Sequence, residues 1–111
     1  MKIGSQVFTA SLYDNATVNA FKLLFPVTFD MVDLNRNEKY VDLSANLPTN
    51  PSNPGTIHVG DLMLYGSSTV VLFYKSFSTS YNYTRLGRID DLSGLAAAVG
   101  SGNVTVTLEL Q

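Results

Sequence analysis

The feature that most constrains the fold is an alternation of apolar and polar residues with a period of two, repeated in separate segments. In residues 104–110, valine or leucine occupies every second position, and threonine or glutamate lies between. Residues 8–13 and 27–31 alternate in the same way. Successive side chains of a β-strand point to opposite faces, so this period predicts strands with one buried face.

Other segments are apolar without alternation. Residues 61–65 and 70–74 contain a single charged side chain between them. Runs of this kind are typical of central strands covered on both faces. Residues 39–43 are predicted to pair, through a turn at 35–38, with the strand that begins at Val27. The apolar parity of that strand shifts after Met31, which predicts a β-bulge.

Two segments are predicted to be helical. The first runs from Ala16 to Phe25, with Asp14 or Asn15 as its cap and Pro26 as its stop. The second follows Asp90-Asp91, has Leu92, Leu95, Ala96 and Val99 on its apolar side, and ends at Gly100. Residues 44–56 hold three prolines and a glycine, so they are predicted to form a long loop.

The candidate site is an aromatic stripe in residues 77–85, which alternate as a strand would. Its aromatic face could form a pocket wall, with a cation to hold an anionic or carbonyl ligand and the proline-rich loop as a flap. In the alternative interpretation the same aromatics fill the interior, and the arginine reaches water. The predicted ligand-binding residues are Tyr40, Phe73, Phe77, Tyr81, Tyr83 and Arg85.

Composition excludes several classes of function. At 111 residues we expect one domain spanning 1–111. A net charge of −2 without a cluster of basic residues argues against nucleic-acid binding. The chain has no cysteine, and no run approaches the ~18 apolar residues of a membrane span. We expect no cofactor and no metal. A cytoplasmic location is favoured if Met1 is the native start, and export if a signal peptide was removed.

Other chemical groups are weaker candidates. His58 is the single histidine, and no second histidine or cysteine completes a zinc site or a triad. Strand parity sends Asp30 and Asp33 to opposite faces unless a bulge intervenes. The Asp90-Asp91 pair is better explained by helix capping. Residues 100–102, Gly-Ser-Gly, follow a helix and precede a strand, the reverse of a phosphate loop.

The predicted elements follow the order ββ-α-β…β-α-β, with about eight strands. This order favours a mainly β fold, a closed eight-stranded antiparallel barrel with two short helices covering its ends. The chain thereby resembles the cyclophilin-like fold. Residues 8–21 are similar to the second strand and first helix of cyclophilins, and residues 86–89 to the strand before the second helix. Segments 60–65 and 70–74 resemble the central strand pair. Residues 60–65, 73–75 and 87–91 resemble segments that recur in compact bacterial cyclophilin-like proteins.

Cyclophilins are prolyl isomerases that use an arginine on the third strand, so the resemblance first implies that activity. The third strand here, residues 27–34, carries Asp30 and Asp33 and no arginine, and the chain has no tryptophan. We therefore expect a binding module that holds a peptide or small molecule without chemistry. A divergent isomerase working through Arg36 or Arg85, and an accessory domain that docks on another protein, are the alternatives.

Overall fold

The computed structural model describes residues 1–110 and contains eleven strands and two helices in that range. In chain order these are β1 (Lys2–Ile3), β2 (Gln6–Val7), β3 (Ala10–Leu12), α1 (Ala16–Lys22), β4 (Val27–Leu34), β5 (Glu38–Asp42), β6 (Thr56–Ile57), β7 (Asp61–Tyr65), β8 (Thr69–Phe73), β9 (Phe77–Ser78), β10 (Thr84–Ile89), α2 (Leu95–Val99) and β11 (Val104–Leu108).

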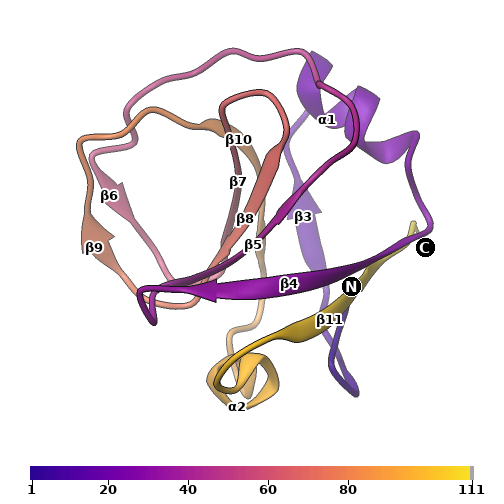
Figure 1. Ribbon diagram of the computed structural model, residues 1–111, viewed down its shortest axis with the longest axis vertical. Coiled ribbons are helices and arrows are strands. Elements are labelled where there is room, and N and C mark those ends of the chain that lie inside the picture. Colours follow the sequence, from indigo (N-terminus) through magenta and orange to yellow (C-terminus); the bar gives the residue numbers. More distant parts are fainter. Residues whose placement is uncertain (111) are drawn as a thin grey trace.

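Nine strands form one curled sheet in the order β2-β1-β11-β4-β5-β8-β7-β10-β3, and every neighbouring pair is antiparallel. The sheet curves like half of a barrel, with α1 at one end and α2 at the other (Figure 1). The predicted mainly β fold with two short helices is confirmed. The apolar runs of β7 and β8 lie inside the sheet, as predicted.

The predicted closed eight-stranded barrel is wrong. Among residues 1–110 no ladder joins the two edge strands, β2 and β3. These strands follow each other in the chain through Phe8 and Thr9, without the reversal of direction that antiparallel pairing needs. Backbone hydrogen bonds anchor this link instead, from Phe8 to Met1 and from Asp90 to Thr9.

The main core fills the inner, concave face of the sheet. Leu62 and Leu64 of β7 and Leu72 of β8 lie there, together with buried residues of both helices. The Asn15 side chain caps α1 by accepting a hydrogen bond from the Val18 amide at 2.8 Å, as the sequence predicts. Both helices are shorter than predicted.

The second helix was also predicted to start too early. The Asp91 carboxylate accepts from the Ser93 amide in a turn, and α2 begins only after Gly94. Asp90 accepts instead from the Ser11 hydroxyl at 2.7 Å. The aspartates therefore shape the turn before the helix, and neither caps it.

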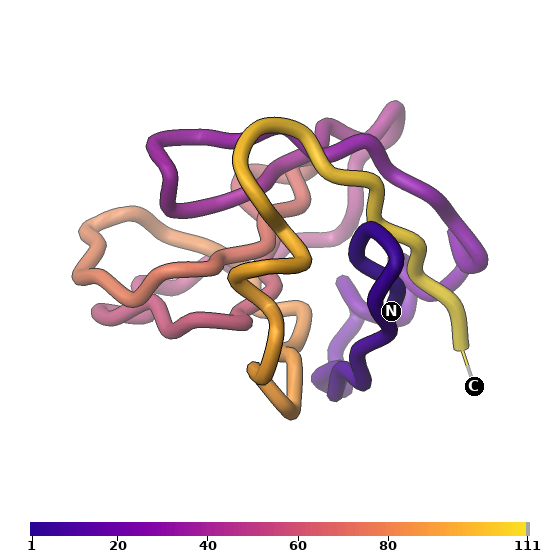
Figure 2. Tube along the Cα trace, turned by 90° about the horizontal axis from the view of Figure 1, so that it is seen from below, coloured from indigo at the N-terminus to yellow at the C-terminus, as the bar shows by residue number. Residues whose placement is uncertain are grey.

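A second, smaller cluster packs on the outer face of the sheet. The strands β6 and β9 pair with each other and cover this face, and the segments around them project to one side of the molecule (Figure 2). The predicted continuous strand over residues 77–85 is wrong, because the chain leaves extended pairing after Ser78. The Tyr81 amide donates to the Thr79 hydroxyl, which makes a local turn there. The cluster consists of Ile57, Met63, Val71, Phe73 and Tyr83, with Tyr40 and Phe77 against it.

The bulge predicted in β4 is also wrong. This strand pairs with β11 up to Met31 and with β5 from Val32 onward, without a shift of register. Phe29 and Met31 are buried on the inner face, whereas Val32 and Leu34 lie exposed on the outer face. The apolar residues change from odd to even positions because β4 presents apolar side chains to both faces of the sheet. In the described part of the chain, no helix has the length and apolar character needed to span a membrane.

Candidate functional site

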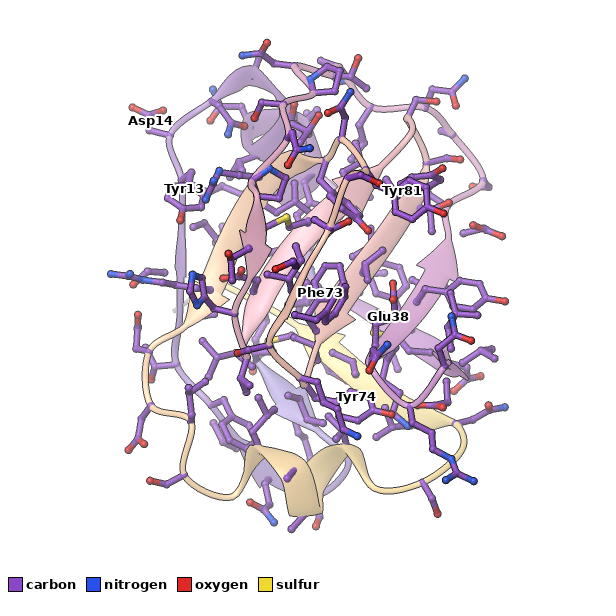
Figure 3. The ribbon with its side chains drawn as sticks, turned by 90° about the vertical axis from the view of Figure 1, so that its left-hand side faces the viewer. Tyr13, Asp14, Glu38, Phe73, Tyr74 and Tyr81 are labelled. Atoms are coloured by element: carbon purple, nitrogen blue, oxygen red, sulfur yellow. The ribbon has the colours of Figure 1, made fainter. Side chains whose placement is uncertain are left out.

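One wall of a groove on the outer face is formed by every second residue of β5. Glu38, Tyr40 and Asp42 share that face because side chains alternate along a strand. The turn that places them is tight, since Asn35 and Arg36 have φ of 55° and 56°. This geometry suits a type I′ hairpin turn, which requires positive φ at both central residues. Glu38 lies on the same side of the molecule as Phe73 and Tyr81 (Figure 3).

The opposite wall is a group of three tyrosines. The ring of Tyr65 lies 6.1 Å from that of Tyr81 and 5.7 Å from that of Tyr83, measured between ring centres. These spacings are typical of favourable edge-to-face and tilted aromatic pairs. Thr69 and Val71 of β8 form the floor, because they pair with Asp42 and Tyr40 of the first wall.

The groove has a volume of about 400 Å³. It is lined by Leu34, Asn35, Glu38, Tyr40, Asp42, Tyr65, Thr69, Val71, Tyr81 and Tyr83. We call this set the tyrosine groove.

The residues predicted from the sequence fall into three places. Tyr40, Tyr81 and Tyr83 line the tyrosine groove. Phe73 and Phe77 lie behind it, with their ring centres 5.7 Å apart. Phe73 also packs edge-on against Tyr83, with a distance of 5.6 Å between ring centres. They support the wall from within the outer cluster.

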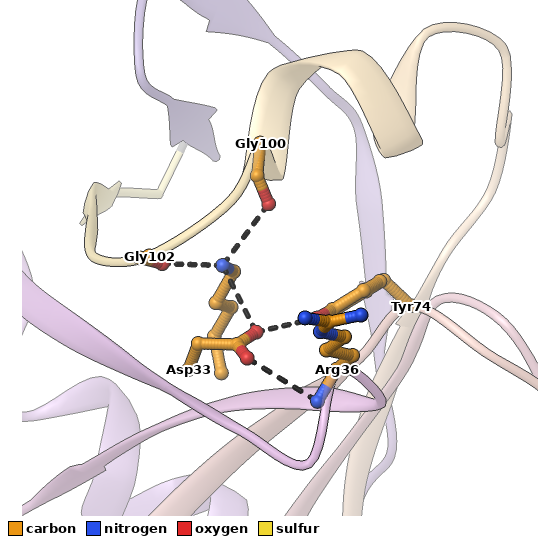
Figure 4. A network of polar contacts seen from close by, with 6 residues as sticks. Asp33, Arg36, Tyr74, Gly100 and Gly102 are labelled. Atoms are coloured by element: carbon orange, nitrogen blue, oxygen red, sulfur yellow. Dashed lines mark hydrogen bonds and ion pairs between the residues drawn. The ribbon is translucent and has the colours of Figure 1, made fainter.

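Arg85, the predicted cation, does not join these aromatics. It is exposed and lines a separate hollow together with His58, Tyr13 and Arg88. Arg36, the other arginine considered, lies in the β4–β5 turn beside Tyr74 (Figure 4). Neither arginine lines the tyrosine groove.

Sequence reasoning missed seven of the ten residues that line the groove, among them Glu38, Asp42 and Tyr65. Glu38 and Asp42 are two residues on either side of Tyr40, so strand parity alone places them on the face of that tyrosine. Tyr65 shares a face with Met63 by the same rule. The spacing therefore predicts which residues share a face with Tyr40 or Met63. It does not predict that these faces form one groove, because that depends on the pairing of β5 with β8.

The groove is acidic. Burial raises the pKa of Glu38, and the nearby charge of Asp33 raises it further. Burial and then the charge of Glu38 also raise the pKa of Tyr83. Asp42 accepts a hydrogen bond from the Thr69 hydroxyl at 2.7 Å. No lysine, arginine or histidine is among the lining residues.

Directly behind the groove, on the inner face of β5, lies a buried lysine. Lys39 has 0% of its side chain exposed. Its ammonium group donates to the carbonyl oxygens of Gly100 and Gly102 and forms an ion pair with Asp33 at 3.1 Å (Figure 4). All three ammonium protons thus have an acceptor, as a buried charge requires.

Tyr74 completes this network, which we call the Lys39 network. Its hydroxyl donates to the Asp33 carboxylate, and the Lys39 ammonium lies 5.2 Å from the centre of its ring. The hydrogen bond from Tyr74 and the contact with Lys39 lower the pKa of Asp33. Burial, followed by the Asp33 carboxylate, raises the pKa of Tyr74 to about 12. The network ties the β4–β5 hairpin to the segment after α2.

The remaining candidates have local structural roles. Asp30 and Asp33 lie on opposite faces of β4, as parity predicts, and Asp30 accepts from the Thr105 hydroxyl at 3.2 Å. Asn53 accepts from the Gly55 amide within the proline-rich loop. That loop forms a bridge with Tyr83 through Ser52, yet none of its residues lines the tyrosine groove. In residues 1–110 no group of three or more histidine, aspartate or glutamate side chains is placed to hold a metal.

Comparison with known proteins gives one match. The model of the cyclophilin-like family matches residues 1–109, nearly the whole chain. The search of curated proteins and the search of solved structures found no significant match. The resemblance inferred from the sequence is thereby confirmed for the family.

Proposed function

This chain belongs to the cyclophilin-like family, and we propose that it is a binding module that holds a peptide segment or small molecule in the tyrosine groove. The observation that carries this proposal is the convergence of four tyrosines from β5, β7 and the segment before β10 on one cavity. Pockets for small ligands have volumes of roughly 300–1,000 Å³ and combine aromatic walls with a few polar groups. The tyrosine groove has both properties.

The exposure of the tyrosines also supports binding. Tyr81 is 61% exposed and Tyr65 is 47% exposed, so both rings are accessible to a ligand. Tyrosine offers a rigid apolar ring and a polar hydroxyl, and it is enriched where proteins recognise ligands. Side chains needed only to fill a core would gain more from complete burial.

An isomerase mechanism receives less support. It needs a donor near the amide nitrogen of the substrate, and Arg36 and Arg85 both lie outside the groove. We expect the protein to leave the rate of a proline-limited refolding reaction unchanged. Acceleration of that reaction that is lost in the Arg36→Ala or Arg85→Ala variant would favour the divergent isomerase instead.

An NMR titration tests the binding proposal. The probes are four capped tripeptides, acetyl-Gly-X-Gly-amide, in which X is lysine, glutamate, phenylalanine or proline. At least one probe should shift the amide signals of Tyr40, Tyr65 and Tyr81, and the Tyr81→Ala variant should weaken that response. Tyr13→Ala is the matched control, because Tyr13 is exposed outside the groove. The proposal fails if no probe acts, or if the shifts centre on the hollow of Arg85 and His58.

A further inference from the structure

We propose that the ligand of the tyrosine groove carries a positive charge, an ammonium or guanidinium group held by the Glu38 carboxylate and the surrounding tyrosine rings. This inference rests on the proposed binding function and names the chemistry that the groove selects. It replaces the anionic or carbonyl ligand that an arginine in the site would have favoured.

The first support is the balance of charge around the cavity. Glu38 and Asp42 are the ionisable acids of the lining, and no basic side chain lines it. Arg36 follows the lining residue Asn35, but its side chain lies beside Tyr74 (Figure 4). Lys39, between the lining residues Glu38 and Tyr40, is turned to the other face and fully engaged there. An anion in the groove would meet two carboxylates without a compensating charge.

The second support is that the Glu38 carboxylate has no partner of its own. No group within residues 1–110 donates a hydrogen bond to it or forms an ion pair with it. Glu38 is half-buried, and its unpaired carboxylate oxygens remain open to the groove and its solvent. A cationic ligand would supply the missing partner. The Asp42 carboxylate, in contrast, already accepts from Thr69.

The third support is the arrangement of the rings. Tyr40 lies between Glu38 and Asp42 along β5, and Tyr65, Tyr81 and Tyr83 stand opposite. Aromatic faces attract cations within about 6 Å of the ring centre, and tyrosine is among the better rings for this interaction. The chain already uses this contact behind the groove, where the Lys39 ammonium lies 5.2 Å from the ring centre of Tyr74.

Calorimetry with matched probes tests the inference. The lysine and arginine peptides, acetyl-Gly-Lys-Gly-amide and acetyl-Gly-Arg-Gly-amide, are compared with the norleucine peptide, which keeps the four side-chain carbons of lysine without the charged group. We expect the charged peptides to bind at least about tenfold more tightly, as one charge-assisted contact predicts. Butylammonium is included as a small-molecule probe. Binding of butylammonium as tight as that of the lysine peptide identifies a small organic cation as the ligand, and binding of the peptides alone identifies a basic peptide.

Variants show whether the charge acts through the groove. Glu38→Gln should weaken the affinity for the lysine peptide about tenfold and leave the affinity for the norleucine peptide unchanged. Glu109→Gln is the matched control, with the same change of charge at an exposed residue outside the groove. Equal loss in both variants would indicate general attraction to an acidic protein and would overturn the inference.

The remaining outcomes distinguish failure of the cation inference from failure of the proposed binding function. If the norleucine, phenylalanine or proline peptide binds in the groove as tightly as the lysine peptide, the cation inference fails and the proposed binding function stands. If no probe binds, both fail.

Discussion

Glu38 and Lys39 are neighbours in β5, yet their side chains lie on opposite faces of the sheet and in unlike surroundings. On the inner face, Lys39 is completely buried, and Asp33, Gly100 and Gly102 accept from its ammonium group. On the outer face, Glu38 is half-buried in the tyrosine groove without a donor from residues 1–110. The same strand thus carries one charge that the fold itself neutralises and one that it leaves unpaired.

The comparison separates two uses of a charged side chain. A buried ion pair with all its hydrogen bonds made fixes one arrangement of the segments it joins, and it is costly to break. A charge left unpaired in a cavity contributes little to folding but can recognise a ligand. Substitutions on the inner face should therefore change stability, and substitutions on the outer face should change binding. The following predictions test this division, from the largest expected effect to the smallest.

The Lys39→Met variant should show the largest loss of stability. It leaves Asp33 without its cation and two carbonyl oxygens without their donor, so we expect the free energy of unfolding to fall by about 3 kcal/mol. Urea denaturation measures this. Lys2→Met, at an exposed position of β1, should change stability by less than about 0.5 kcal/mol. A loss below about 1 kcal/mol at Lys39 would show that the network does not stabilise the fold.

The Asp33→Asn variant should reveal the same network through its pH dependence. We expect a loss of about 2 kcal/mol near neutral pH, because Lys39 then lacks a countercharge. The pKa of Asp33 is lowered in the folded protein. Its ionised form therefore contributes stability above the unfolded pKa of 3.8 and loses that contribution as pH falls through the folded pKa. The difference between wild type and variant should be constant from pH 7 to about pH 5 and shrink in acid; a constant difference down to about pH 2 would contradict this.

The Tyr74→Phe variant should cost about 1 kcal/mol near neutral pH, since it removes one hydrogen bond to Asp33 and keeps the ring near Lys39. At high pH this advantage of wild type shrinks. The pKa of Tyr74 is raised from 10.0 to about 12, so wild type should lose stability relative to the variant between these two values. Denaturation series at pH 8 and pH 11 measure both effects. An advantage of wild type that does not shrink at pH 11 would exclude the hydrogen-bonded arrangement.

The Glu38→Gln variant should show the smallest change in stability, within about 0.5 kcal/mol of wild type. The sign of this small change in stability is also predicted. A carboxyl group whose folded pKa is raised contributes stability below its unfolded pKa and loses it as pH rises, so the neutral variant should be slightly more stable at pH 7. Thermal unfolding of the two proteins checks this. A loss above about 1 kcal/mol would mean that Glu38 has a structural partner.

Much of the fold is predictable from the sequence because local patterns encode it. The strands β7, β8 and β11 and the Asn15 cap depend on residues close together in the chain. Closure of the barrel does not. It depends on whether the edge strands β2 and β3 pair with each other, and the pattern within each strand does not encode that.

The candidate site divides in the same way. Strand parity places Tyr40 with Glu38 and Asp42, but the tyrosines opposite them are set by a turn at Thr79 and by the pairing of β7 with β8. The burial of Lys39 was not predictable locally, since its carbonyl partners lie 61 and 63 residues further along the chain. The sequence predicts residues 100–102 only as a connector, whereas in the structure two of their carbonyl oxygens accept from Lys39.

The ionisation of Glu38 is the most direct test of the division between the two faces of β5. Carbon-13 NMR of its side-chain carboxyl group can follow the titration with and without saturating acetyl-Gly-Lys-Gly-amide. We expect a pKa above the ordinary value of 4.5 in the free protein, a lower pKa once the lysine peptide is bound, and no change with the norleucine peptide. A pKa at or below 4.5 in the free protein, or one that saturation with the lysine peptide does not move, would contradict the account.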